Sequence, residues 1–211
     1  MKRFFFAAVA FPALMSASAL ACNGQVGKTI HEDTFADNSG GWELTPQLTA
    51  IKPPNFVITL SPNSYNIASQ VLTFRAKEAD FCVQGTVPKA MAPDNNFALG
   101  LEFWATDYKN LWMAQLASDG TVTLWTETNG AWNIIFKVPN APGFKAEGSN
   151  AFRVTTLGGK IAVSVNGQPV KTVRAQVPEG EFRFGVFGQL DKLAENATPI
   201  VVTSYKVTSG Q

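Results

Sequence analysis

Residues 97–128 read FALGLEFWATDYKNLWMAQLASDGTVTLWTET, and apolar and polar side chains alternate along this stretch. In residues 97–104 the odd positions are all apolar, whereas the even positions are mixed and include Glu102 and Trp104. Because successive side chains of a β-strand point to opposite faces, this alternation predicts strands with one face on a core. The run SDG at 118–120 supplies the tight turn of a hairpin. We therefore expect an antiparallel meander here.

Similar turn residues recur along the rest of the chain. NG at 129–130, GG at 158–159 and NG at 166–167 each join two short alternating runs, and these residues tolerate the positive φ of hairpin turns. We therefore expect residues 97–166 to be mostly an antiparallel meander. Proline at 53–54, within 88–93 and within 138–142 indicates longer loops, since proline donates no ladder hydrogen bond. No stretch sustains helical periodicity.

This pattern predicts an all-β chain, folded as a two-sheet antiparallel β-sandwich. The expected strands are Thr29–Phe35, Phe56–Leu60, Asp80–Val87, Phe97–Trp104, Leu111–Ala117, Thr121–Thr128, Trp132–Val138, Ala151–Leu157, Lys160–Asn166, Val170–Arg174, Phe182–Phe187 and Ile200–Thr208.

Alternation also assigns side chains to faces. In residues 132–138 it predicts that Trp132, Ile134, Phe136 and Val138 face the core. The opposite, outer faces then carry Glu102, Trp104, Met113, Gln115, Thr123, Trp125, Glu127, Asn133, Lys137, Arg153, Arg183 and Phe187. We expect function to lie among this outer set.

Residues 1–21 have the layout of a secretory signal peptide. Lys2 and Arg3 precede the apolar stretch 4–14, and the segment closes on the small-residue motif ALA at 19–21. The apolar stretch is too short to span a bilayer as a helix. We therefore expect an exported, periplasmic or secreted protein, with residues 22–211 as a single β-sandwich domain.

The chain has two cysteines, Cys22 and Cys82. In an exported protein an even count predicts a disulfide between them. Cys22 would be the first residue after cleavage, so lipid attachment at this cysteine is the alternative, although ALA is a better match to an ordinary cleavage site.

The charge balance excludes some partners. Without Lys2 and Arg3 the 17 basic residues become 15, against 16 acidic ones, which is a net charge of −1. Nucleic-acid binding requires a basic surface and is therefore not expected.

The sequence lacks the residues that several kinds of catalysis require. His31 is the single histidine, so triad catalysis and a zinc site are both disfavoured. No phosphate-binding glycine motif is present, and we expect no cofactor. Calcium stays open, because Asp33 and Asp37 lie close together in sequence; capping of turns is the alternative role for both.

Two acids and two aromatics on the outer faces suggest sugar chemistry. Glycoside hydrolysis uses a pair of carboxylates, and Glu102 and Glu127 are the candidates if their strands are neighbours. Trp104 and Trp125 offer flat apolar platforms for the C–H face of a sugar, with hydroxyl partners on neighbouring side chains. The expected ligand-binding set is Trp104, Trp125, Glu102, Gln115, Glu127 and Arg183. The alternative is that a loop covers each tryptophan, so that both are part of the core.

Several segments resemble the concanavalin A-like jelly-roll superfamily. They are DTF at 33–35 with GW at 41–42, FWATDYKNL at 103–111, NAFRV at 150–154 and IAVSVNG at 161–167. Within this superfamily the chain looks most like laminin-G-like domains and bacterial 3-keto-disaccharide hydrolase domains. The laminarinase-type Glu-x-Asp-x-Glu strand is missing. Trp104 and Ser204 stand where hydrolase relatives often have Arg and an acid, which disfavours catalysis and calcium binding.

The sequence supports three hypotheses of different classes. The first is a carbohydrate-binding protein without catalytic activity that uses the outer face around Trp104 and Trp125. The second is a glycoside hydrolase acting on a small or 3-keto glycoside through Glu102 and Glu127. The third is a structural or protein-interaction domain of the cell envelope.

Overall fold

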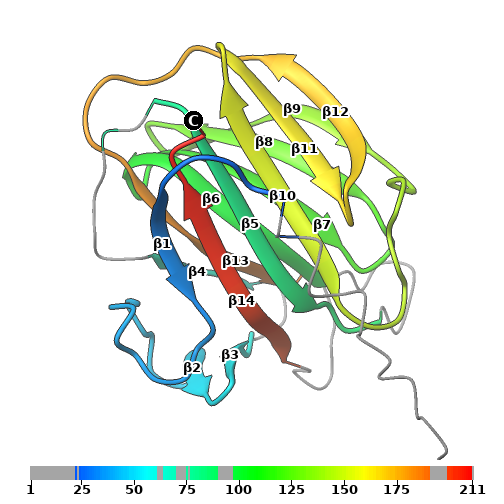
Figure 1. The fold of residues 1–211 in the computed structure, drawn as a ribbon. Helices are drawn as coiled ribbons and strands as arrows, with labels where there is room; N and C mark the ends of the chain where they lie inside the picture. Colours follow the sequence, from blue (N-terminus) through cyan, green and yellow to red (C-terminus); the bar gives the residue numbers. More distant parts are fainter. Residues whose placement is uncertain are drawn as a thin grey trace, which may run out of the picture.

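The computed structural model describes residues 22, 24–60, 64–69, 75, 77–89, 97–190 and 199–210, with 64–69 described by their backbone alone. Two antiparallel sheets pack face to face as a β-sandwich (Figure 1). The described residues contain no helix, and so none that could cross a membrane. The predicted signal peptide, residues 1–21, lies outside the described residues.

One sheet has six strands in the order β4-β13-β6-β7-β8-β9. Four consecutive strands form the predicted meander, and β13 and β4 extend the sheet beyond β6. The strands are β4 (Ser64–Ser69), β6 (Phe97–Asp107), β7 (Asn110–Ala117), β8 (Val122–Thr128), β9 (Ala131–Val138) and β13 (Arg183–Leu190).

The other sheet has eight strands in the order β12-β11-β10-β5-β14-β3-β2, with β1 also paired to β14. Its strands are β1 (Thr29–Asp33), β2 (Thr49–Lys52), β3 (Asn55–Ile58), β5 (Ala79–Thr86), β10 (Asn150–Leu157), β11 (Lys160–Val165), β12 (Gln168–Arg174) and β14 (Ile200–Thr208). The chain changes sheet between β9 and β10, so the meander ends there rather than continuing to residue 166 as expected.

The twelve predicted strands are all present, with small differences at their ends. Two short strands, β2 and β4, were not predicted. Pro53 and Pro54 form the tight turn between β2 and β3 instead of a longer loop.

The core lies between the two sheets and is rich in aromatic side chains. Phe81 and Phe152 face it from the eight-stranded sheet, whereas Leu101 and Phe103 face it from the six-stranded sheet; all four are fully buried. Burial of this apolar surface supplies the main favourable term in folding.

His31 packs among the aromatic side chains of this core. Its ring centroid lies 5.5 Å from those of Trp42 and Phe184 and 6.1 Å from that of Tyr205. Burial lowers the pKa of His31, and the nearby carboxylate of Asp33 opposes this shift only in part. Imidazole in this position is stabilised in its neutral form.

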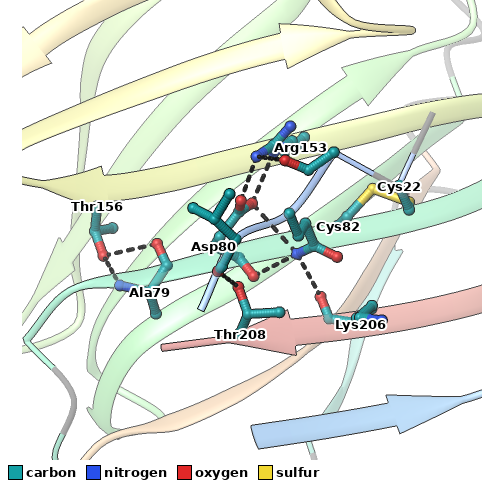
Figure 2. A network of polar contacts seen from close by, with 11 residues as sticks. Cys22, Ala79, Asp80, Cys82, Arg153, Thr156, Lys206 and Thr208 are labelled. Atoms are coloured by element: carbon teal, nitrogen blue, oxygen red, sulfur yellow. Dashed lines mark hydrogen bonds and ion pairs between the residues drawn. A yellow bond between two sulfur atoms is a disulfide. The ribbon is translucent and has the colours of Figure 1, made fainter. Parts of the chain in front are cut away.

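A disulfide joins Cys22 to Cys82, as the cysteine count predicted. The bond attaches the segment before β1 to the outer face of the eight-stranded sheet (Figure 2). The sulfur of Cys22 in this bond is not available to carry a lipid thioether. A disulfide is typical of proteins in oxidising compartments and is compatible with export.

An ion pair beside the disulfide holds the same segment (Figure 2). Asp80 is almost fully buried and accepts hydrogen bonds from Arg153, with 2.8 Å between Nε and Oδ1. Gln25 Nε2 donates to the backbone carbonyl of Asp80 at 2.6 Å, and Thr208 Oγ1 donates to the carbonyl of Val26 at 2.7 Å. Arg153, expected on an outer face, therefore has a structural role.

Candidate functional site

A hollow of about 210 Å³ lies on the outer face of the six-stranded sheet. It draws side chains from four strands and is mostly apolar. Its lining residues are Met113, Gln115, Trp125, Trp132, Phe187 and Gln189. Met113 and Phe187 belong to a small apolar cluster on this face, separate from the main core, against which both tryptophans pack. An apolar cluster on an outer sheet face, combined with a hollow, is typical of a binding surface.

The strand register explains why these side chains meet. Met113 on β7 lies opposite Trp125 on β8, and Gln115 lies opposite Gly100 on β6. Gly100 also faces Phe187 on β13. A Cβ atom on Gly100 would lie 2.9 Å from Cδ1 of Phe187, so the absence of a side chain there allows the Phe187 ring to lie over β6.

Two residues that line the hollow each have a buried polar atom without a hydrogen-bond partner. Trp125 Nε1 and Gln115 Oε1 are both buried, and neither forms a hydrogen bond in the structure. Gln115 is 7 % exposed as a whole. Buried polar groups are normally paired, because each unpaired group costs about 1–3 kcal/mol. One orphan is a donor and the other an acceptor, so a hydroxyl group, which both donates and accepts, matches this pair.

Trp132 lies in this hollow, and its predicted position in the core is wrong. The register between β8 and β9 shifts after Leu124, so that Leu124 faces Phe136 whereas Trp125 faces Ile134. This irregularity leaves one residue of β9 without an opposite partner and reverses the faces of the residues before it. Phe136 points to the core, as expected. The rings of Trp125 and Trp132 meet edge to face with centroids 6.3 Å apart.

Trp104 was predicted on the outer face, but it lies in the core. It is 1 % exposed, with a left-handed φ of 49° at a point where β6 loses its regular register with β7 and β13. Its ring packs edge to face on Trp112, with centroids 5.9 Å apart. The alternative position for this residue, among the core aromatics, is the one that the structure shows.

A second cavity, of about 280 Å³, lies at the ends of β6, β7 and β8. It is lined by Trp104, Thr106, Asn110, Leu111, Trp112, Thr126, Glu127, Thr128 and Pro178. Two candidates from the sequence, Trp104 and Glu127, thus share this cavity, whereas Trp125 and Gln115 share the hollow. Burial raises the pKa of Glu127, and the nearby charge of Asp107 adds to the shift.

Glu102 and Glu127 lie on the same face but not close together. Glu102 is opposite Met113, which is opposite Trp125, and Glu127 is two residues further along β8. With strands about 4.8 Å apart and a rise of about 3.3 Å per residue, their Cα atoms are about 12 Å apart. This backbone separation exceeds the distance of about 5–9.5 Å at which glycosidases hold their catalytic carboxyl groups, so the two side chains would have to lean toward each other. Glu102 is also only 1 % exposed.

Arg183 is engaged by other protein groups at the edge of this face. Its guanidinium forms an ion pair with Glu43 at 2.5 Å and lies over the Tyr108 ring, 5.2 Å from the centroid. The Tyr108 hydroxyl in turn donates to Glu43. Partial burial raises the pKa of Glu43, but the hydrogen bonds from Tyr108 and Arg183 outweigh it and lower the pKa overall.

The two calcium candidates both act within turns. Asp33 accepts hydrogen bonds from the backbone N–H of Phe35 at 2.6 Å and from Trp42 Nε1 at 2.7 Å. Asp37 accepts one from the N–H of Ser39 at 2.7 Å. Among the described residues, no group of three His, Cys, Asp or Glu side chains is placed to hold a metal ion.

No family model matches this chain, and no curated protein sequence matches it. Solved structures do share its fold. The carbohydrate binding module CBM66 from Bacillus subtilis aligns with a TM-score of 0.59 and 16 % identity, over 79 % of this chain and 96 % of that one. The β-glucanase of Bacillus licheniformis aligns at 0.61 and 16 %, over 87 % and 99 %.

The carbohydrate recognition domain of Emp46p, in its metal-free form, aligns with a TM-score of 0.65 and 13 % identity, over 83 % of this chain and 92 % of that one. At such low identity these likenesses show the fold alone, which is the two-sheet jelly-roll β-sandwich that the sequence predicted. The same fold carries both binding proteins and enzymes, so the function has to be argued from the site.

Proposed function

We propose that this protein binds carbohydrate, without catalysis, through the hollow on the outer face of the six-stranded sheet. The observation that carries the proposal is the pair of unpartnered polar atoms, Gln115 Oε1 and Trp125 Nε1, within an apolar and aromatic lining. A sugar ring presents C–H groups on its face and hydroxyl groups at its edge. Its face fits the aromatic surface, and one or two hydroxyls satisfy both orphan atoms.

The size and chemistry of the hollow favour one sugar ring over other ligands. A volume of about 210 Å³ is below the usual range for drug-sized ligands. None of the six lining side chains carries a formal charge, so a neutral ligand suits the hollow better than an ionic one. A purely apolar ligand would leave both orphan atoms unsatisfied, at a cost that a hydroxylated ligand avoids.

Binding without hydrolysis is favoured by the positions of the two acids. Glu102 is nearly inaccessible, and the side chains of Met113 and Trp125 lie between it and Glu127 in the register. The arrangement therefore lacks an acid on each side of one bond. The disulfide supports the further proposal that binding takes place outside the reducing cytosol.

The test is a glycan-array and polysaccharide-affinity screen of residues 22–211, comparing the wild type with Trp125→Ala. Removal of a central aromatic contact costs at least about 2 kcal/mol, which is about a 30-fold loss of affinity. Ile135→Ala is the matched control, because Ile135 is an exposed apolar residue of β9 outside the hollow.

We expect wild type and Ile135→Ala to bind the same glycans and Trp125→Ala to lose them while keeping its circular dichroism spectrum. Equal binding by Trp125→Ala would contradict the proposed site. Release of reducing sugar by the wild type, abolished by Glu127→Gln, would favour the hydrolase hypothesis instead.

A further inference from the structure

The cavity at the ends of β6, β7 and β8 contains a polar group that the fold does not satisfy. Trp104 lines this cavity and is 1 % exposed, and its Nε1 has no hydrogen-bond partner. Neighbouring aromatic contacts fix the indole, with ring centroids 5.7 Å from Phe103 and 5.9 Å from Trp112. An unpaired buried donor is costly, and its position beside a cavity indicates an acceptor supplied from outside the protein.

The other side of the cavity supplies an acceptor. Glu127, 7 % exposed, contributes its carboxylate, which has no hydrogen-bond donor among the described residues. Thr106, Thr126 and Thr128 add hydroxyl groups, and Leu111 and Pro178 add apolar contacts. The cavity thus combines an unpaired donor, an available acceptor and apolar surface.

These groups define the charge and polarity of an occupant. An ammonium group has no lone pair to accept from Trp104, so a simple cation leaves the indole unsatisfied. An anion would be repelled by Glu127 and by Asp107, which acts on Glu127 electrostatically, although the nearby Lys109 opposes this repulsion in part. A neutral hydroxyl accepts from the indole and donates to the carboxylate. The volume of about 280 Å³ far exceeds the roughly 30 Å³ share of one water molecule.

We propose that this end cavity is a second binding site, distinct from the outer-face hollow, for a neutral polyhydroxylated molecule such as a monosaccharide or polyol. The site is independent of the hollow in its residues, because none of its lining side chains belongs to the other set. It lies next to the hollow, since Glu127 is two residues from Trp125 on β8.

The indole N–H signals of the five tryptophans provide a direct test by ¹H–¹⁵N NMR. The probes are glucose, galactose, mannose, fructose and glycerol, with glucuronate as the anionic counterpart of glucose. At least one neutral probe is expected to shift the Trp104 signal saturably, and glucuronate is expected to bind more weakly than glucose. Trp104 itself is left unchanged, because its removal from the core would unfold the protein.

Two variants distinguish the sites. Glu127→Gln removes a charge-assisted hydrogen bond and is expected to weaken the Trp104 response at least about tenfold in affinity while the Trp125 signal behaves as in the wild type. Trp125→Ala is expected to leave the Trp104 response intact. A Trp104 signal that no neutral probe shifts, or one whose response is unchanged in Glu127→Gln or lost in Trp125→Ala, would overturn the second site and leave the proposed outer-face function untouched.

Discussion

The ion pair of Asp80 and Arg153 makes a strong prediction about stability. Asp80 is 2 % exposed, whereas the Arg153 side chain is 25 % exposed, so Asp80→Ala leaves a guanidinium in a largely buried position without its partner. Removal of one partner of a buried pair costs about 3–5 kcal/mol. Because Arg153 keeps some solvent contact, we expect a value near the lower limit, about 3 kcal/mol. For a chain of this length that corresponds to a decrease in Tm of about 6–12 °C.

The assay is urea unfolding followed by tryptophan fluorescence, with Glu32→Ala as the matched control. Glu32 pairs with Lys206 at 3.1 Å in the same sheet, but its side chain is 54 % exposed. Exposed pairs contribute about 1 kcal/mol or less. The double variant Asp80→Ala, Arg153→Leu should recover part of the loss, since it removes the orphaned charge. Equal free energies of unfolding for Asp80→Ala and Glu32→Ala would refute the reasoning.

Three further predictions concern other parts of the fold. Because burial lowers the pKa of His31, wild type should lose stability relative to His31→Phe as pH falls through about 6.5, the unfolded value; parallel Tm profiles from pH 8 to 5 would contradict this. Reduction of the Cys22–Cys82 disulfide, whose cysteines are 60 residues apart, should lower the free energy of unfolding by about 4 kcal/mol. Urea unfolding with and without dithiothreitol measures this difference, and unchanged midpoints would refute it. Gly100→Ala should cost about 1–3 kcal/mol and reduce glycan affinity, because the new Cβ would lie 2.6 Å from a backbone oxygen; wild-type stability in a thermal melt would disprove this overpacking.

The sandwich could be predicted from sequence because its signals are local. Alternation and turn residues mark strands such as β7 and β8 without any knowledge of their partners. The strands β2 and β4 were missed, although β3 and β11, which have the same lengths, were predicted, so length alone does not explain the omission. Their pairing with β3 and β13, which sequence patterns do not reveal, is what defines them.

The site was predicted only in part, and the errors occur at irregularities of the strands. Trp125 and Gln115 follow the regular register between β7 and β8, so alternation assigned them to the correct face. Trp104 and Trp132 lie beyond register shifts, where the period of two fails and the side chain changes face. Phe187 was placed on the outer face but not assigned to the site, because its proximity depends on Gly100 of another strand.

The most direct measurement of the central claim is a crystal structure of residues 22–211 with the glycan that binds best in the screen. The account predicts a sugar ring against Trp125 and Trp132, with hydroxyl groups within about 3.2 Å of Gln115 Oε1 and Trp125 Nε1. A ring bound elsewhere on the molecule, with Gln115 and Trp125 still unpartnered, would contradict it, as would the absence of any binding glycan.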